Sequence, residues 1–167
     1  MSFTAAIITV SDKVAGGKRE DESGPALERL LLEAGAKSVV RAVVPDEREQ
    51  IAAALRGHCT QRRVDLVITT GGTGMAPRDV TPEATRDVID RDAPGFAEAV
   101  RAESLRVTAR AMLSRAVSGI CASTLIINFP GSPMACEESF AIVRPALGHA
   151  LELLGGAGVD CARKQPY

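Results

Sequence analysis

Apolar residues fall along the chain in two kinds of run, and the two kinds alternate. Short, β-branched runs at 5–10, 39–44, 66–70 and 124–129 have the length and continuity of strands buried on both faces. Between them, longer segments place apolar residues three and four positions apart, as on one face of a helix. This alternation predicts an α/β fold: a three-layer α/β/α, Rossmann-like domain with a mostly parallel sheet and helices on both faces. We expect a single domain over residues 1–167, because neither an internal repeat nor a low-complexity linker divides the chain.

The first two predicted helices have clear boundaries. The first carries apolar residues at positions 27, 30, 31 and 34, and Gly35 is placed to end it. The second opens after Pro45, with Asp46 as its N-cap and Glu49 at the capping-box position. Its apolar face includes His58, for which a structural role is favoured over a ligand or catalytic role.

The later helices are read from their first residues and their apolar stripes. We expect a helix at 81–89 with Thr81 as its N-cap and Pro82 in its first turn, and another at 96–104. Ser132 is expected to cap the final helix, with Pro133 at its first position. The buried stripe of that helix is Phe140, Val143, Leu147, Leu151 and Leu154. Three stretches are less defined: 13–21 is polar and mobile-looking, 109–116 fits a short helix or a loop, and 155–167 has no periodicity.

Polar and glycine-rich sequences follow four of the predicted strands. They are Ser11-Asp12, Asp46, the glycine loop at residues 71–74, and the stretch that begins at Pro130. Because the carboxyl ends of parallel strands meet at one edge of a sheet, we expect all four to lie together, where ligands of such sheets bind.

The glycine loop follows a predicted strand and precedes a predicted helix. Three glycines in four residues, Gly71, Gly72 and Gly74, let the backbone turn sharply and bring its N–H groups close to an anion. The loop matches neither the Walker A pattern, because no Lys follows it, nor the dinucleotide pattern, because Pro77 stands at the third glycine position. The glycines alone therefore fit an anion-binding loop and a tight structural turn equally well.

Composition excludes some classes of partner and compartment. Lys plus Arg number 20 and Asp plus Glu 21, so no overall charge favours a nucleic-acid or membrane partner. With no Trp and one Tyr, the chain also offers few aromatic side chains on which bases could stack. We therefore expect no nucleic-acid or membrane partner. No segment resembles a secretory signal or a membrane span, which predicts a cytoplasmic protein. The four cysteines are too scattered for a Cys-x-x-Cys pair and are expected to be reduced thiols, some of them buried.

The longer string from Thr69 to Thr85, Thr-Thr-Gly-Gly-Thr-Gly-x-x-x-Arg-Asp-Val-Thr-Pro-Glu-Ala-Thr, is far more specific than its glycines. It resembles the signature of the MogA/MoaB-type molybdopterin adenylyltransferases, a family that includes the G domain of gephyrin. Four further segments agree in order: Thr-Val-Ser-Asp at 9–12, Val-Val-Pro-Asp-Glu at 43–47, Leu-Ser-Arg-Ala at 113–116, and the run from Thr to Pro at 124–133. The resemblance extends from about Ala5 to Leu154.

The resemblance implies transfer of AMP from ATP to the terminal phosphate of molybdopterin, with release of pyrophosphate. It implies Mg²⁺ held by the catalytic residues Asp46 and Asp79, with Asp12 as a weaker third carboxylate. It makes Arg78 a group that neutralises developing charge, unless Arg78 only pairs with Asp79. The full set implied for nucleotide and pterin binding is Ser11, Asp12, Thr70, Gly71, Gly72, Thr73, Gly74, Arg78, Ser104, Ser114, Arg115, Pro130, Gly131 and Ser132.

Each of these roles has a simpler structural alternative. Asp46 fits a helix cap, Asp79 fits general compensation of a helix dipole, and the Pro130 stretch fits a strand-to-helix turn. Ser104, Ser114 and Arg115 also fit ordinary exposed polar positions. The resemblance further implies a homo-oligomer, a trimer or hexamer, and contact with a downstream molybdenum-insertion protein.

The sequence leaves two other functions open. One is a molybdopterin-binding or carrier protein of the same fold without turnover, against which the two aspartates and the intact loop argue. The other is a CinA-like activity, since that family shares the glycine-loop fold, although usually beside an additional domain. A nucleophilic hydrolase fits poorly, because the chain has two His and no Gly-x-Ser-x-Gly elbow.

Overall fold

A six-stranded sheet forms the centre of the molecule in the computed structural model, which describes residues 2–156. Its strands lie in the order β2-β1-β3-β6-β5-β4. The first four are parallel neighbours, whereas β5 pairs antiparallel with β6 and β4 pairs antiparallel with β5. The bounds are β1 Phe3–Val10, β2 Ala36–Val44, β3 Leu66–Thr70, β4 Arg91–Asp92, β5 Ser118–Cys121 and β6 Thr124–Phe129.

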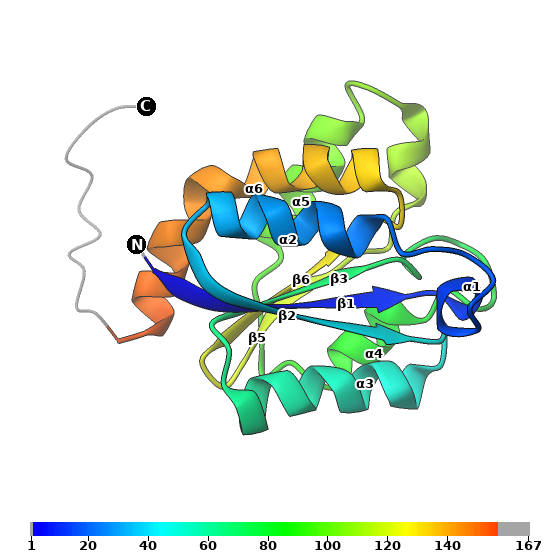
Figure 1. Ribbon diagram of the computed structural model, residues 1–167. Coiled ribbons are helices and arrows are strands. Elements are labelled where there is room, and N and C mark those ends of the chain that lie inside the picture. Colours follow the sequence, from blue (N-terminus) through cyan, green and yellow to red (C-terminus); the bar gives the residue numbers. More distant parts are fainter. Residues whose placement is uncertain (1, 157–167) are drawn as a thin grey trace.

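Helices cover both faces of this sheet, as the alternation of patterns predicted (Figure 1). One face carries α2 (Ser23–Glu33), α5 (Gly95–Ser104) and α6 (Pro133–Leu154), and the other carries α3 (Arg48–Arg56) and α4 (Thr81–Arg86). Three short helices complete the elements: α1 (Asp12–Ala15), the π-helix η1 (Gly57–Arg62) and the 3-10 helix η2 (Ala109–Leu113). The three-layer α/β/α architecture is thus confirmed.

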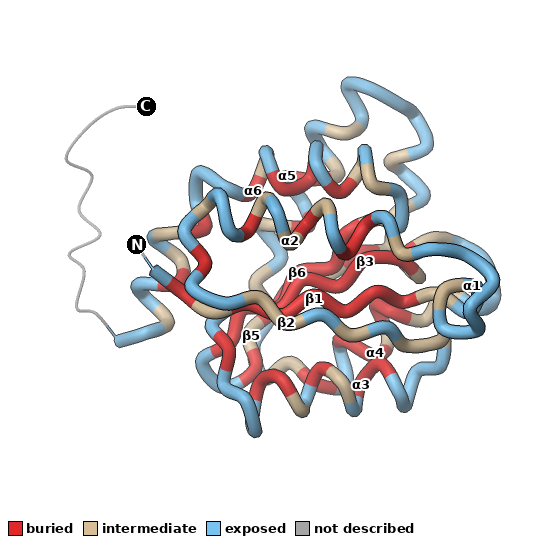
Figure 2. Tube along the Cα trace, viewed as in Figure 1, coloured by how far each residue is buried: buried red, intermediate tan, exposed pale blue. Residues whose placement is uncertain are grey.

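The core consists of two apolar layers, one on each side of the sheet. Along β1 the side chains of Ala5 and Ile7 enter the layer beneath α2 and α6, whereas Ala6 and Ile8 enter the layer beneath α3 and α4. Figure 2 shows the central strands buried along their length, with exposure rising toward the outer faces of the helices. Successive strand residues point to opposite faces, so a strand covered on both sides has to be apolar throughout.

Two of the predicted helix boundaries are confirmed in atomic detail. Gly35 follows α2 with φ of 101°, a conformation that glycine adopts without steric cost. Ser132 caps α6, because its Oγ accepts a hydrogen bond from the N–H of Ala135 at 3.3 Å, and Pro133 is the first residue of the helix.

The antiparallel end of the sheet was not predicted. β4 consists of the exposed pair Arg91 and Asp92, and β5 has only four residues, so neither carries an apolar run long enough to be recognised. Two other stretches gain structure: the first three residues of the polar stretch 13–21 belong to α1, and residues 109–113 of the ambiguous stretch form η2. The third predicted helix ends at Arg86 instead of 89.

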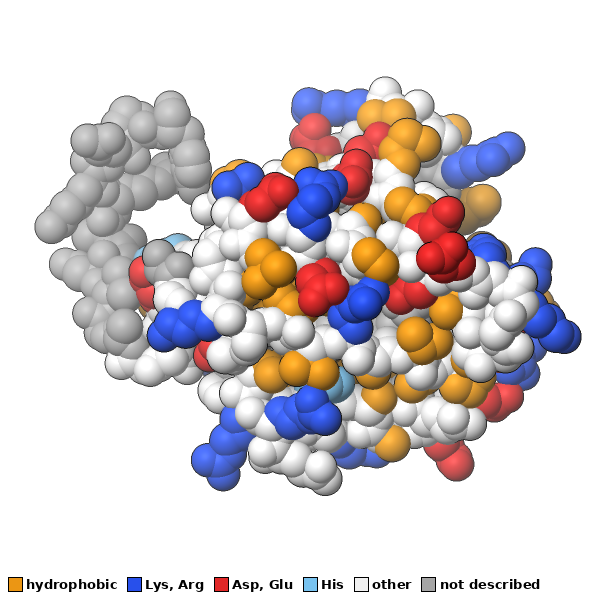
Figure 3. Space-filling view, in the orientation of Figure 1, with side chains coloured by type: hydrophobic (Ala, Val, Ile, Leu, Met, Phe, Trp, Pro, Cys, Tyr) orange, Lys and Arg blue, Asp and Glu red, His pale blue; other side chains and the backbone are white. Residues whose placement is uncertain are grey.

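The described residues contain no helix long and apolar enough to cross a membrane. On the face drawn in Figure 3, both basic and acidic side chains are spread over the surface.

Candidate functional site

A cavity of about 420 Å³ lies at the carboxyl ends of β1, β3 and β6. We call it the strand-end cavity; it is lined by residues 9–11, 14, 19–23, 46, 70–72, 79 and 131–133. The strand order reverses at this point, because β2 lies on one side of β1 and β3 on the other. Such switch points are where open α/β sheets bind ligands, and the prediction that four strand ends share one edge is confirmed.

Two positions of the glycine loop have no room for a side chain. Gly71 has φ of 98°, and a Cβ there would lie 2.3 Å from the carbonyl oxygen of Val10. Gly72 has φ of 64°, and its Cβ would lie 2.3 Å from Oγ1 of Thr81. Both positions therefore exclude any side chain, whatever the loop binds.

The same loop also leaves backbone donors free. The N–H of Gly71 donates to the carbonyl of Phe129 at 3.2 Å, but the next four N–H groups, those of residues 72–75, have no acceptor among the described residues. Consecutive free N–H groups on a turn can bind an anion such as phosphate. The turn and the anion-binding interpretations of the loop are thus compatible.

Thr81 closes the loop instead of capping α4, and the predicted cap is wrong. The N-cap of α4 is Val80, without a side-chain hydrogen bond. The Thr81 hydroxyl donates to the carbonyl of Gly71 at 2.9 Å, and its N–H donates to the carbonyl of Gly72 at 3.1 Å. The buried Thr81 hydroxyl lies at the base of the loop. There it donates to the Gly71 carbonyl instead of accepting from an N–H group of α4.

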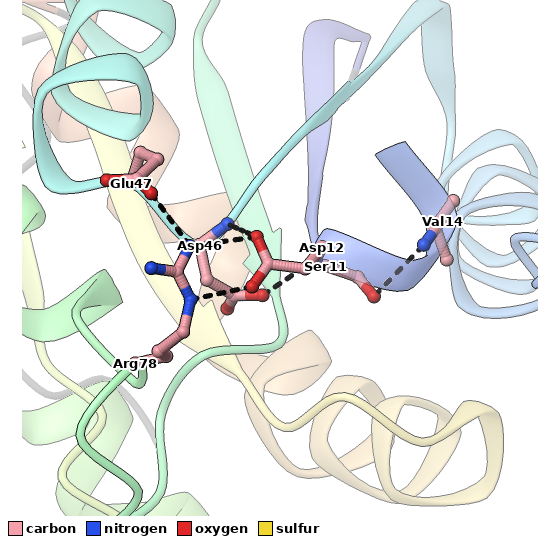
Figure 4. Close-up of polar contacts among 6 residues, drawn as sticks. All are labelled: Ser11, Asp12, Val14, Asp46, Glu47 and Arg78. Atoms are coloured by element: carbon pink, nitrogen blue, oxygen red, sulfur yellow. Dashed lines mark hydrogen bonds and ion pairs between the residues drawn. The ribbon is translucent and has the colours of Figure 1, made fainter. Parts of the chain in front are cut away.

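The predicted capping box at Asp46 is wrong as well. Glu47 is the N-cap of α3, but its side chain makes no capping hydrogen bond, and Asp46 points toward Asp12 instead. The two residues bond reciprocally: Oδ2 of Asp46 accepts from the N–H of Asp12 at 2.8 Å, and Oδ1 of Asp12 accepts from the N–H of Asp46 at 3.0 Å (Figure 4). The ends of β1 and β2 are thereby joined by two carboxylates.

Arg78 binds this pair of strand ends and not its neighbour Asp79. Its Nε and Nη2 donate to both oxygens of Asp12, at 2.7 and 3.0 Å, and Nη2 also donates to Glu47 at 2.8 Å (Figure 4). The bond with Arg78 lowers the pKa of Asp12 below its ordinary value. The suggested pairing of Arg78 with Asp79 is therefore wrong. Asp12 is held by a guanidinium that already neutralises it.

Asp46 and Asp79 both face the strand-end cavity, as expected. Burial raises the pKa of Asp46, and the charges of Asp12 and Asp79 act in the same direction. Oδ2 of Asp79 accepts from the N–H of Ala76 at 2.8 Å. In each carboxylate, Oδ1 has no hydrogen-bond donor among the described residues.

These two free oxygens fit a divalent cation of the Mg²⁺ type. Residues 2–156 contain no cluster of three or more side chains that could hold a metal ion. Mg²⁺ commonly takes one or two carboxylates and completes its octahedron with water and substrate phosphate, so a two-carboxylate site beside free loop N–H groups suits it. Two like charges at one cavity also favour a cation that neutralises them.

The remaining predicted residues divide between the cavity and its supports. Ser11, Thr70, Gly131 and Ser132 line the strand-end cavity. Their polar groups are partly used within the fold: Ser11 caps α1, and the Thr70 hydroxyl donates to the carbonyl of Pro130 at 2.7 Å. Ser104 ends α5 and lines none of the cavities described here. Ser114 and Arg115 line a different cavity of about 450 Å³ together with Arg86 and Arg101.

Sequence reasoning missed one wall of the strand-end cavity. Asp21 accepts from the Thr9 hydroxyl at 3.0 Å and from the N–H of Gly24 at 2.9 Å, and the Ser23 hydroxyl donates to the carbonyl of Gly131 at 3.1 Å. These contacts bring the start of α2 against the ends of β1 and β6. The available signal was Asp21, a polar residue just before α2, but it belongs to the stretch 13–21 that was predicted to be mobile.

His58 and the three cysteines that the structure describes do not line the strand-end cavity. His58 is buried in η1, and burial lowers its pKa, as expected for a structural histidine. Cys59, Cys121 and Cys136 are free and buried, which confirms the prediction for these three, and burial raises the pKa of Cys59 to about 12. Cys161 and the rest of 157–167 lie outside the described residues.

Known proteins of similar sequence and structure agree with one another. Residues 6–149 match the family described as a probable molybdopterin binding domain. The chain is 40% identical over 152 residues to the molybdopterin adenylyltransferase of Helicobacter pylori J99, covering 90% of this chain and 86% of that protein. It is 41% identical over 155 residues to the molybdenum cofactor synthesis protein cinnamon of Drosophila melanogaster, covering 92% of this chain but only 26% of that longer protein. Among solved structures, the molybdopterin biosynthesis enzyme MoaB of Thermus thermophilus superposes with a TM-score of 0.87 and 45% identity, covering 92% of this chain and 97% of that one.

Proposed function

Since the chain belongs to the family of molybdopterin-binding domains of molybdenum cofactor biosynthesis, we propose that it is a Mg²⁺-dependent molybdopterin adenylyltransferase. One observation carries this proposal: the free carboxylate oxygens of Asp46 and Asp79 face one cavity beside four loop N–H groups that have no acceptor among the described residues. In the reaction, an oxygen of the terminal phosphate of molybdopterin attacks the α-phosphorus of ATP. A new P–O bond forms, and the bond to the leaving pyrophosphate breaks.

The arrangement suits a reaction that joins two anions. Asp79 lines the strand-end cavity and also a second cavity of about 300 Å³, formed with residues 75–77, 80, 83 and 115. Two ligands in these cavities would meet at Asp79. Transfer between phosphates requires alignment and charge neutralisation more than a protein nucleophile.

The roles of the residues follow from their contacts. The loop N–H groups of residues 72–75 would bind phosphate oxygens, and Asp46 with Asp79 would hold Mg²⁺. When bound, the ion neutralises charge on the transferred phosphate and the leaving pyrophosphate. Arg78 keeps Asp12 neutralised and fixes the strand ends that carry Asp46.

The test is direct. The protein is incubated with molybdopterin, ATP and Mg²⁺, and pyrophosphate and adenylylated pterin are measured, with the expected result of one pyrophosphate for each pterin adenylylated. Omission of Mg²⁺ should abolish the reaction. Pterin binding without pyrophosphate would contradict the proposal and support the carrier alternative.

The assembly and location form a second part of the proposal. Between α5 and α6 lies a groove of about 380 Å³ with an almost entirely apolar lining, which we call the α5–α6 groove: Ala93, Pro94, Gly95, Phe96, Ala99, Ile142, Val143 and Ala146. An exposed apolar groove of this kind suits contact between protein chains. We place the chain in a homo-oligomer, a trimer or a multiple of one, in the cytoplasm, where it would pass its product to a molybdenum-insertion protein.

A further inference from the structure

Of the site residues predicted from the sequence, Arg115 connects the largest number of separate parts of the candidate site. It follows η2 on a segment that passes beside the glycine loop, where its N–H donates to the carbonyl of Thr73 at 2.9 Å. Its side chain reaches further: Nε donates to the carbonyl of Gly74 at 2.7 Å, and Nη2 donates to the carbonyl of Asp79. Nη1 pairs with Glu83 on α4 at 2.5 Å.

All three guanidinium nitrogens are therefore occupied by protein acceptors. A planar guanidinium presents its donors in a fixed fork, so binding two carbonyls and a carboxylate together sets the relative position of all three. Three of the five N–H donors are thus bound to protein acceptors, so Arg115 holds the fold together beside the substrate-binding role that the family resemblance implied for it.

The carbonyls that Arg115 holds determine where the loop donors point. In a trans peptide the N–H and C=O groups point in opposite directions. Since the carbonyls of Thr73 and Gly74 face Arg115, the N–H groups of Gly74 and Met75 face away from it. Both N–H groups lack an acceptor within the described residues, as expected for donors directed toward a ligand.

Arg115 also holds the backbone at Asp79. The carbonyl of Asp79 is bound to Nη2, while its carboxylate accepts from Ala76 three residues earlier. Thr81 fixes the loop at Gly71 and Gly72, so Arg115 supplies the fixed points further along, at Gly74 and Asp79. A shift there of even 1 Å would move a carboxylate that must meet a metal ion, and shifts of that size can cost about 10²-fold in rate.

We infer that Arg115 is a positioning residue for adenylyl transfer: it orients the phosphate-binding N–H groups of the loop and places Asp79. This inference rests on the proposed function for its reaction, but its binding consequences can be measured independently.

Glu83 determines how the test must be designed. Its Oε2 is buried without a hydrogen-bond partner, so removing Arg115 alone would leave an unpaired carboxylate in the fold. The variants are therefore Arg115→Lys, which keeps the charge but loses the fork, and the double substitution Arg115→Met with Glu83→Gln, which removes both charges. Arg48→Met is the matched control, because Arg48 also forms a two-pronged ion pair at α4, with Asp87, but touches no part of the loop.

Steady-state kinetics and binding are measured well below each melting temperature. We expect kcat to fall about 10- to 100-fold in both Arg115 variants, on the scale of one lost preorganised contact. Mg–ATP binding should weaken about tenfold, while molybdopterin affinity changes less than about threefold. The Arg48→Met control should match the wild type. Normal kcat and Mg–ATP binding in Arg115→Lys would overturn the inference, because charge alone would then suffice.

A double-mutant cycle with Asp79→Asn separates positioning from a merely structural role. If Arg115 acts through Asp79, Arg115→Lys should cost less than about threefold in kcat once Asp79 has been neutralised. Fully additive losses would contradict the inference. Should the wild type bind Mg–ATP but release no pyrophosphate, the proposed function fails, and the Mg–ATP dissociation constants still decide the role of Arg115.

Discussion

The carboxylate of Asp79 is divided between two tasks: one oxygen accepts from the N–H of Ala76, and the other is free at the strand-end cavity. An asparagine can keep the first contact through its carbonyl oxygen but has no charge to hold a cation. The conformation of the loop should therefore survive this change even though the metal site would not.

We predict that Asp79→Asn slows pyrophosphate release by about 10²-fold or more, the scale of other electrostatic losses at such sites. Molybdopterin affinity and the melting temperature should change little. Asp87→Asn is the matched control, since it neutralises an exposed aspartate at the far end of α4 and should leave turnover unchanged. Near-normal turnover in Asp79→Asn would contradict the proposed metal-binding role of Asp79. Unfolding of the variant would show instead that Asp79 has a structural role.

At the scale of elements, close contacts with neighbouring segments determine the conformation of the turn from β3 to α4. Gly71 lies against the end of β1, and the Thr81 hydroxyl returns from α4 to bind its carbonyl. The loop therefore holds β1, β3 and α4 together before any ligand is present.

Gly71→Ala tests this view. We expect it to lower the free energy of unfolding by about 2 kcal/mol or more, because the new Cβ would meet the Val10 carbonyl in a backbone conformation unfavourable to alanine. Gly57→Ala is the control: the nearest atom to a Cβ built at this position, where η1 begins after α3, is Oε1 of Gln61 at 4.0 Å, so stability should be unchanged or slightly higher. Urea unfolding measures the free energy of unfolding of both variants. Equal stability of the two would contradict the prediction, because the loop would then have relaxed to accommodate the Cβ.

At the scale of the molecule, the α5–α6 groove leaves an apolar surface uncovered on the outside of one helical layer. Most of the residues that line it are small, so a second chain could approach closely. The lining of the strand-end cavity includes none of these residues.

Light scattering should give three or six times the mass of one chain for the wild type at micromolar concentration. We predict that Ala99→Glu, which places a charge in the α5–α6 groove, yields a monomer, because a buried unpaired charge is costly. Ala53→Glu, at an exposed position on α3, should leave the mass unchanged. A monomeric wild type would refute the proposed assembly.

Periodicity and glycine placement determined most of the fold from the sequence. The runs at β1, β2, β3 and β6, the end of α2 at Gly35 and the cap of α6 at Ser132 all depend on contacts close in sequence or on burial. The shared edge of the strand ends follows from the parallel topology alone, so Asp46, Asp79 and the glycine loop could be placed at one site. Short exposed strands such as β4 carry no such signal.

Tertiary structure decided which partner each polar group took. Asp46 and Thr81 each had a local role as a helix cap, but their side chains bond across the strand ends and the loop instead, with Asp12 and Gly71. Arg78 pairs with the carboxylates of Asp12 and Glu47, 66 and 31 residues away, and not with Asp79 beside it in the sequence. Arg115 donates to the carbonyls of Gly74 and Asp79. Local sequence fixes which backbone groups need a partner, but a side chain bonds whichever acceptor or donor the folded chain brings nearest, and at a sheet edge those come from distant segments.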